Sequence, residues 1–333
     1  MTGESARLVS IPEALVPDHG KAEWFRGADG ATLRAATFFP EGPTNSGKAR
    51  GSVVVSPGRS EPIEKYFEVV EDLLGRGFAV LLHDWRGQGL SARGLPDRLK
   101  GHARGFKTFL SDYKALLDTF EARLPKPWIA LSHSMGGCLT MLALAQGETR
   151  FSAAVLSAPM LGLNSGGIPP WIATPLAWTV SRVGMAGEYV QGGQYDPLAQ
   201  TFVGDALTHD EARYDRYQAQ LRADPEIALG GMTWGWADFA ISACAWLRRS
   251  KGVERIGVPV TIVAAELDNR VLNPDQKAIA DRMPKGRYVE VPGAFHEILI
   301  ETDPRRAIFW RAFDETVDPV APKEPLISPN ASD

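Results

Sequence analysis

The sequence predicts an α/β fold in which helices cover both faces of a mostly parallel central sheet. Short apolar runs rich in Val, Ile and Leu alternate with stretches whose apolar residues recur at helical spacing. The apolar runs are nearly continuous, as in strands buried on both faces, and do not alternate with polar residues. A third observation is a break in this rhythm from about residue 160 to 240, which predicts an insertion.

Six strands and the helices between them can be placed in order along the chain. The expected strands are 51–56, 78–84, 128–133, 153–158, 258–265 and 288–291. Helices are expected over 62–76, 106–123, 135–146, about 274–282 and about 303–316. Sheets of this kind bind ligands beyond the carboxyl ends of their strands. The loops that follow the strands are therefore where a site is expected.

The chain divides into a two-part core, an insertion and two ends. Residues 23–159 and 241–316 are expected to form the α/β core, and residues 160–240 an inserted helical cap. Residues 1–22 mix Pro, Gly and charge without periodicity, and residues 317–333 carry four prolines. Both ends are therefore expected to be loose.

The insertion is rich in tryptophan, glycine and proline. Its tryptophans are Trp171, Trp178, Trp234 and Trp236, and residues 169–176 form an apolar run. These side chains suit contact with an apolar substrate, and they suit equally well a small core within the cap. The alternative to a cap is a helical decoration that does not touch the substrate.

Composition excludes several classes of protein. The chain has 333 residues, of which 44% are hydrophobic and 23% charged, with a net charge of −4, which is typical of a globular protein and not of a nucleic-acid binder. Two cysteines, Cys138 and Cys244, cannot build a disulfide framework or a four-ligand zinc site. No secretory signal or membrane-spanning run is visible, so a cytoplasmic protein is expected, with peripheral contact at the inner face of the membrane left open.

The most informative motif is the segment 132–137, SHSMGG, which follows a predicted strand and opens a predicted helix. This is the context of a nucleophile elbow, G-x-S-x-G, in which a tight turn exposes the central serine. Ser134 is then the candidate nucleophile, although Ser132 stands where glycine is usual. The alternative is a glycine-rich turn with a capping serine.

A serine nucleophile needs a base, and the base needs an acid that orients it. In sheets of this type the chain order is serine, acid, histidine. Only His209 and His296 follow Ser134, and His296 lies on the loop after the last predicted strand. Asp268 is the preferred acid because it lies in the loop after the fifth predicted strand, with Glu266 as the alternative.

An oxyanion hole requires two N–H donors. The Met135 amide, next to the serine, is one candidate. The other is the Arg59 amide in the segment 56–61, SPGRSE, where Gly58 allows close approach of the backbone. The Arg59 side chain is expected to pair with Glu61, or alternatively to meet an anionic head group.

Taken together, these motifs resemble the α/β-hydrolase superfamily, and within it the branch of monoacylglycerol lipases and bacterial lysophospholipases. The matching segments are 56–61 with Lys65 and Tyr66, 83–91 (HDWRGQGLS), 132–137, 158–160 and 293–299 (GAFHEIL). The resemblance implies Ser134 as nucleophile, Asp268 as acid and His296 as base. It also implies Met135 and Arg59 as oxyanion donors and a structural turn at 84–91.

The resemblance and the apolar insertion together imply a serine hydrolase that cleaves lipid-like monoesters, either lysophospholipids or monoacylglycerols. Small-ester esterase, thioesterase and peptidase activities remain open on the same residues, as does a ligand-binding protein without catalysis. No metal or organic cofactor is implied, because the sequence has no HExxH motif, no P-loop and no dinucleotide fingerprint.

Overall fold

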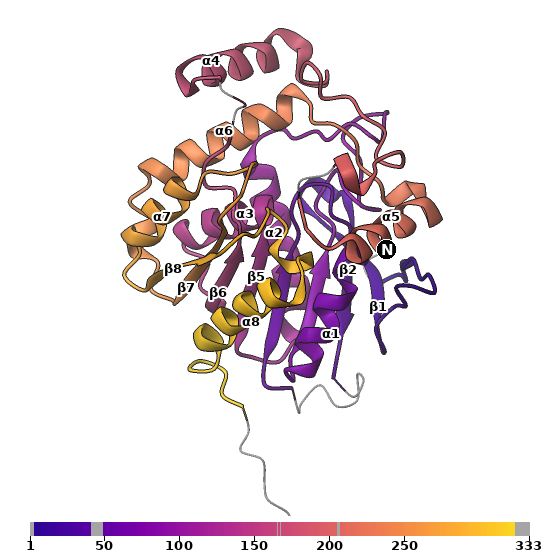
Figure 1. The fold of residues 1–333 in the computed structure, drawn as a ribbon, viewed down its shortest axis with the longest axis vertical. Coiled ribbons are helices and arrows are strands. Elements are labelled where there is room, and N and C mark those ends of the chain that lie inside the picture. Colours follow the sequence, from indigo (N-terminus) through magenta and orange to yellow (C-terminus); the bar gives the residue numbers. More distant parts are fainter. Residues whose placement is uncertain (1–2, 41–48, 165, 167, 205–206, 324–333) are drawn as a thin grey trace, which may run out of the picture.

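The computed structural model describes residues 3–40, 49–164, 166, 168–204 and 207–323. Its centre is an eight-stranded sheet in the order β1-β2-β4-β3-β5-β6-β7-β8 (Figure 1). The strands are β1 (Lys21–Arg26), β2 (Thr32–Phe38), β3 (Ser52–Ser56), β4 (Ala79–His83), β5 (Trp128–His133), β6 (Phe151–Ser157), β7 (Val260–Ala265) and β8 (Gly286–Val291). From β4 to β8 all neighbours pair in parallel, so the prediction of a mostly parallel sheet is confirmed.

The six predicted strands are present, but the hairpin of β1 and β2 was missed. β2 pairs antiparallel with both β1 and β4 and is almost fully buried. The sequence of β2, TLRAATF, does not predict a buried strand, because alanine has a low strand propensity and Arg34 places a charge near the middle of the segment. The Arg34 guanidinium is accommodated by Glu64, at 2.7 Å, and Asp84, also at 2.7 Å.

Helices cover the sheet on both faces. One face carries α1 (Phe67–Gly75) and α8 (Asp303–Val317), and the other carries α2 (Phe106–Phe120), α3 (Ser134–Ala145), α6 (Trp234–Arg249) and α7 (Asn273–Arg282). Alternate strand residues supply the two cores. In β3, for example, Val54 faces the α3 side while Val53 and Val55 face α1.

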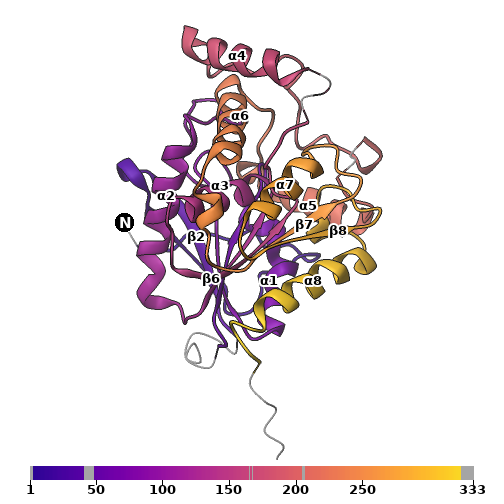
Figure 2. The same cartoon turned by 90° about the vertical axis from the view of Figure 1, so that its left-hand side faces the viewer.

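The insertion lies between β6 and β7 and contains α4 (Pro170–Val180), α5 (Glu211–Ala223) and the start of α6. α6 continues to residue 249, beyond the expected boundary at 240, because its apolar side packs on α3 as part of the body. α4 lies above α6, on the side away from the sheet, as two perpendicular views agree (Figures 1 and 2). Trp236, on α6, is buried, whereas Trp171 and Trp178, on α4, are exposed.

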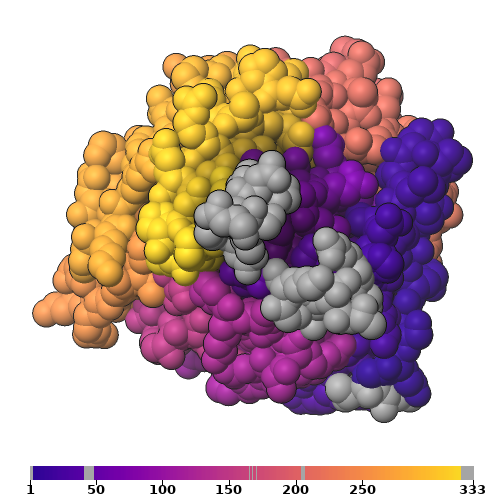
Figure 3. All heavy atoms as spheres, turned by 90° about the horizontal axis from the view of Figure 1, so that it is seen from below, coloured from indigo at the N-terminus to yellow at the C-terminus, as the bar shows by residue number. Residues whose placement is uncertain are grey.

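The N-terminal residues, expected to be loose, pack on the molecule in the described part. A bridge joins Ser5 to Glu23, and Val9 and Ile11 are buried against α5 residues such as Leu221. In the space-filling view from below, this indigo segment lies on the same side as the salmon region of α5 (Figure 3). Of the expected C-terminal tail, residues 324–333 lie outside the described residues. No helix in the described ranges is both long and apolar enough to cross a membrane.

Candidate active site

Ser134 lies at the junction of β5 and α3, in the tight turn that the sequence predicts. Its backbone has φ 47°, a conformation that non-glycine residues rarely adopt. Gly136 is required by the close packing of this turn, because a Cβ there would lie 2.2 Å from the Ser56 carbonyl oxygen. The turn therefore presents the Ser134 side chain beyond the carboxyl end of the sheet.

Ser132, which departs from the usual glycine, is accommodated by a hydrogen bond. Its buried hydroxyl lies 2.8 Å from the hydroxyl of Thr140, two turns along α3. The extra polar atom is thus satisfied within the body, so it carries no burial penalty.

His296 connects Ser134 to Asp268. The loop after β8 places His296 Nε2 2.9 Å from Ser134 Oγ, and His296 Nδ1 lies 2.7 Å from Asp268 Oδ2. An imidazole with its proton on Nδ1 donates to the aspartate and accepts from the serine hydroxyl, which is the arrangement needed for proton transfer. The structure brings these three predicted residues together in one hydrogen-bonded chain.

Asp268 is held in place and kept ionised by its surroundings. Its Oδ1 accepts hydrogen bonds from the amides of Arg270, at 2.8 Å, and Val271, at 3.0 Å. Burial opposes ionisation, but the hydrogen bond and charge of His296 and these two amides hold the pKa of Asp268 below its usual value. The carboxylate can therefore stabilise a positive charge on the imidazole.

Glu266 and His209, the alternatives that the sequence offered, have other roles. Glu266 accepts a hydrogen bond from the Gly293 amide at 2.7 Å, so it braces the turn before His296. His209 lies 2.6 Å from Glu301 and stacks on Phe295 at 3.9 Å between ring centroids. Both contacts support the loop that carries His296 without joining the chain to Ser134.

The two candidate oxyanion donors come from neighbouring segments. Met135 is the second residue of α3, and the first N–H groups of a helix have no acceptor within it. The loop of Arg59 is anchored on either side, since the Gly58 amide donates to Glu61 and the Ser60 amide to Gln88. The Gln88 side chain also reaches Met135 Sδ at 3.9 Å, which keeps this loop beside the start of α3.

Glu61 is the centre of a buried network that sequence reasoning missed. It accepts hydrogen bonds from Lys65 at 2.9 Å, from the Tyr66 hydroxyl at 2.6 Å and from His133 Nδ1 at 3.0 Å. The expected pairing of Arg59 with Glu61 is therefore wrong, because these donors already fill the carboxylate. The spacing of Glu61 and Lys65 by four residues was the signal available in the sequence.

The network carries balanced charge next to the nucleophile. His133 has an acceptor at each nitrogen, Glu61 on Nδ1 and the His296 carbonyl at 3.2 Å from Nε2, so both nitrogens must be protonated. Burial opposes this, but Glu61 raises the pKa of His133. Lys65 also bonds Glu297 at 2.5 Å, so two cations meet two carboxylates. The network links the oxyanion loop, the elbow and the His296 loop.

The described residues show no group of three or more His, Cys, Asp and Glu side chains placed to hold a metal ion. Cys138 and Cys244 are both free and buried. The reactive side chains that the structure brings together are those of Ser134, His296 and Asp268.

The mostly parallel sheet, with a strained serine at the turn between β5 and α3 and a His–Asp pair on the loops after β8 and β7, defines an α/β hydrolase. The comparison with family models agrees. The model described as serine aminopeptidase, S33 matches residues 47–303, and the chain belongs to this family. The resemblance predicted from the sequence is thereby confirmed.

Similar proteins include named lipid hydrolases. Lysophospholipase L2 of Escherichia coli (strain K12) is 33% identical over 272 residues, which cover 78% of each chain. A monoacylglycerol lipase of Mycolicibacterium smegmatis is 26% identical over 257 residues, covering 76% of this chain and 84% of the relative. A soluble variant of the Saccharomyces cerevisiae monoglyceride lipase shares the fold, with a TM-score of 0.68 and 19% identity over 90% of this chain and 96% of that one.

Proposed function

We propose that this protein is a serine hydrolase that cleaves carboxylic esters through an acyl-enzyme on Ser134. The observation that carries the proposal is the continuous hydrogen-bonded chain from Ser134 through His296 to Asp268, with distances of 2.9 and 2.7 Å. The family and the named relatives support the same class of reaction.

The reaction follows from the positions of these groups. His296 takes the proton of Ser134 as the hydroxyl attacks the ester carbonyl, and the amides of Met135 and Arg59 stabilise the negative oxygen that forms. The imidazolium then gives its proton to the departing alcohol, which leaves an acyl group on Ser134. Water, deprotonated by His296, releases the carboxylic acid and restores the serine. Asp268 stays ionised throughout.

The proposed substrates are lipid-like monoesters, that is lysophospholipids or monoacylglycerols. The relatives include a lysophospholipase and a monoacylglycerol lipase, and residues 160–240 would act as the cap that receives the acyl chain. Trp171 is 75% exposed and Trp178 is 52% exposed on α4, so this helix suits contact with a lipid surface. We place that contact at the inner face of a membrane, reached from the cytoplasm.

The decisive test compares Ser134→Ala with Ser132→Gly. Removing the nucleophile should lower turnover of a lysophospholipid, a monoacylglycerol and a p-nitrophenyl ester by at least about 10,000-fold. Ser132→Gly keeps the nucleophile and restores the usual elbow glycine, so it should stay within about tenfold of the wild-type rate. Labelling by a fluorophosphonate probe should disappear only in Ser134→Ala.

The same panel separates the alternatives. It should contain esters from acetate to palmitate, a thioester and an aminoacyl anilide. Turnover that rises with acyl length supports a lipid esterase, whereas turnover confined to short esters, the thioester or the anilide would identify an esterase, thioesterase or peptidase. An Ser134→Ala variant as active as the wild type would overturn the mechanism.

The acid is tested by Asp268→Asn beside Glu266→Gln. Asp268→Asn should lower kcat by about 10,000-fold, because the amide cannot hold the imidazole in its productive tautomer. Glu266→Gln keeps an acceptor for the Gly293 amide and should change kcat by less than about threefold. Equal losses in the two variants would contradict the assignment of Asp268.

A further inference from the structure

The Arg59 side chain is placed at the candidate site without a carboxylate partner. Among the described residues no Asp or Glu oxygen lies within ion-pair distance of its guanidinium. The carboxylate that the sequence suggested, Glu61, is occupied by Lys65 and His133. A cation in partly buried surroundings costs free energy unless a partner offsets it, so this arrangement needs an explanation.

Few groups hold the Arg59 guanidinium. Nη1 donates to the Ser60 hydroxyl at 3.1 Å, Nη2 donates to the Gly230 carbonyl, and the Tyr195 side chain is a third hydrogen-bond partner. The ring of Trp236 lies 5.4 Å from Cζ, and Nε is enclosed but has no acceptor in the described structure. These partners are all neutral and do not use every one of the five N–H donors, so the charge of the guanidinium is left without a counter-ion.

Two other arginines among the described residues, Arg34 and Arg93, have more partners than Arg59. Arg34 has two carboxylate partners, Glu64 and Asp84. Arg93 also lacks a carboxylate, but its terminal nitrogens donate to four backbone carbonyls, those of Gly87, Gly89, Glu226 and Ala228. Arg59 has no carboxylate partner and a single backbone carbonyl, that of Gly230. Burial lowers the pKa of Arg59 and Tyr195 opposes this shift only in part, so the cation has no full counter-charge in its surroundings.

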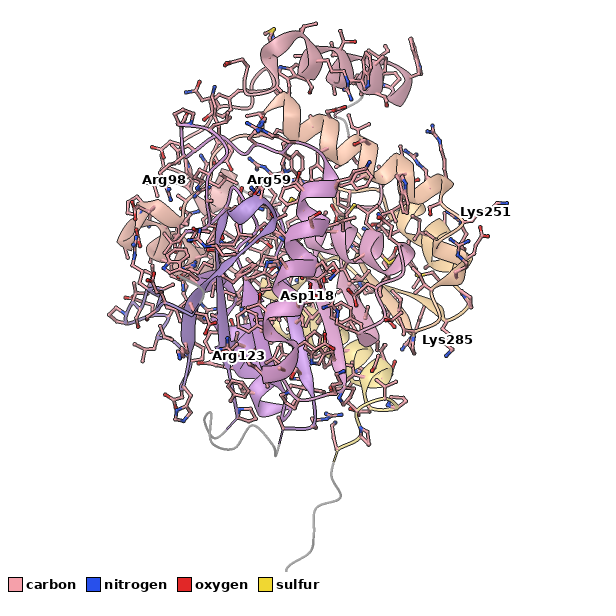
Figure 4. All side chains as sticks on the ribbon, turned by 180° about the vertical axis from the view of Figure 1, so that it is seen from behind. Arg59, Arg98, Asp118, Arg123, Lys251 and Lys285 are labelled. Atoms are coloured by element: carbon pink, nitrogen blue, oxygen red, sulfur yellow. The ribbon has the colours of Figure 1, made fainter. Side chains whose placement is uncertain are left out.

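The position of Arg59 defines which anion would fit. Figure 4 shows Arg59 between the strands of the body and the insertion above them. Its amide is the candidate donor to the ester oxygen, and about six covalent bonds separate that nitrogen from Cζ. In a lysophospholipid, about six bonds separate the ester carbon from the phosphorus. One residue can therefore reach both ends of the glycerol unit.

We propose that the Arg59 guanidinium binds the phosphate of a lysophospholipid whose ester is attacked by Ser134. The inference rests on the proposed hydrolase function and narrows its substrate class. Arginine suits this task because its planar fork donates two parallel hydrogen bonds to phosphate oxygens. A monoacylglycerol carries no charge at this position and leaves the guanidinium without a partner. The lysophospholipid is therefore the preferred substrate, and the monoacylglycerol is the poorer one.

The test measures discrimination between two esters with the same acyl chain, 1-palmitoyl lysophosphatidylglycerol and 1-palmitoylglycerol, in the same nonionic micelles. Wild type should prefer the lysophospholipid in kcat/KM. Arg59→Met should lower the ratio of the two kcat/KM values at least tenfold, mainly through KM for the lysophospholipid. Arg59→Lys keeps the charge but loses the fork, so it should recover part of the ratio.

Arg93→Met is the matched control, because it removes another partly buried arginine that has no carboxylate partner. The ratio of the two kcat/KM values for Arg93→Met should equal that of the wild type, even if the free energy of unfolding of the variant is lower. Glycerophosphoglycerol and inorganic phosphate are added separately as competitors of a p-nitrophenyl ester. Competition by glycerophosphoglycerol alone supports a head-group site, and equal competition by inorganic phosphate would overturn it in favour of a free-phosphate site.

The outcomes separate this inference from the proposed function. Hydrolysis of both esters with a ratio that Arg59→Met does not change would refute the phosphate site and leave the hydrolase intact. Hydrolysis of the monoacylglycerol alone would do the same. Failure of the wild type to cleave either ester, or any other carboxylic ester, would refute the hydrolase itself.

Discussion

The insertion has two arms that are attached to the body by different contacts. The α4 arm comprises residues 168–186, and the α5 arm comprises residues 207–229. In the α5 arm, Arg213 donates to Glu68 of α1 at 2.6 Å, and Arg216 binds the same carboxylate. Arg306 of α8 reaches Glu68 at 2.7 Å, so one acidic residue joins three elements. The arm also lies against the N-terminal segment through buried apolar contacts.

The α4 arm has few polar ties and an apolar surface. Within the described ranges it is joined to α6 by backbone contacts such as Gly235 N to Ala186 O and by the exposed pair of Arg182 and Asp238 at 3.4 Å. Its exposed apolar side chains are Ile168, Trp171, Ile172, Leu176, Trp178, Val183 and Met185. Single exposed apolar residues are ordinary, but seven of them within eighteen consecutive residues make this segment a candidate binding surface.

The difference assigns separate tasks to the two arms. The α5 arm includes His209, which stacks on Phe295 next to His296, so its position affects the geometry of the site. Fixing it by charge keeps the His296 loop in place. The α4 helix is farther from the sheet (Figure 2), and its exposed tryptophans are the part of the insertion for which we propose contact with a lipid surface.

The largest effect in this comparison is expected from Glu68→Gln. Loss of the charge leaves Arg213, Arg216 and Arg306 without their shared partner and should lower the free energy of unfolding at pH 7 by about 2 kcal/mol, allowing for partial exposure. Burial opposes ionisation, but Arg213, Arg306 and Arg216 lower the pKa of Glu68 to about 2. Its contribution is therefore present above about pH 4.5 and is lost as the pH falls toward 2.

Denaturant unfolding of both proteins from pH 7 down to pH 2 tests this prediction. The difference between wild type and Glu68→Gln should shrink steadily below about pH 4.5. Glu71→Gln is the control, because Glu71 lies on the same helix and forms no ion pair among the described residues. Its free energy of unfolding at pH 7 should stay within about 0.5 kcal/mol of the wild type. A constant difference at all pH values would show that Glu68 does not act through its charge.

The parallel strands and the site residues that follow them could be predicted from the sequence, because apolar runs and short motifs are local patterns. Apolar runs predict six strands, the elbow motif predicts Ser134, and the order serine, acid, histidine predicts His296 with either Asp268 or Glu266 as the acid. The structure places His296 within hydrogen-bonding distance of both Ser134 and Asp268. The choice of Asp268 over Glu266 could be argued only from position in the loop, since both follow the same strand.

The remaining features depend on contacts between distant residues. Arg34 is a charged residue in the middle of a buried strand, and Glu64 and Asp84, thirty and fifty residues further on, allow it to lie inside the sheet. Glu61 was expected to pair with Arg59, two residues away, but His133 approaches it from the elbow. In both cases a charge pairs with a partner that only the fold brings close, and no local pattern identifies that partner.

The smallest effect on stability is expected from changing α4. Trp171 and Trp178 lie seven residues apart, two turns along one face of the helix, and both are largely exposed. The double substitution Trp171→Ser and Trp178→Ser should change the free energy of unfolding by less than about 1 kcal/mol. It should nevertheless weaken binding to phospholipid vesicles about tenfold or more, because two large aromatic surfaces no longer enter the lipid interface.

Vesicle sedimentation and the hydrolysis of a water-soluble short ester distinguish this role from a structural one. Val203→Ser changes an even more exposed apolar residue, 96% exposed, that lies outside α4, and it should leave vesicle binding unaltered. The short ester needs no interface, so the double variant should cleave it at the wild-type rate. If the double variant instead unfolds easily and binds vesicles normally, then α4 is a packing element and the two arms differ only in the kind of contact that holds them.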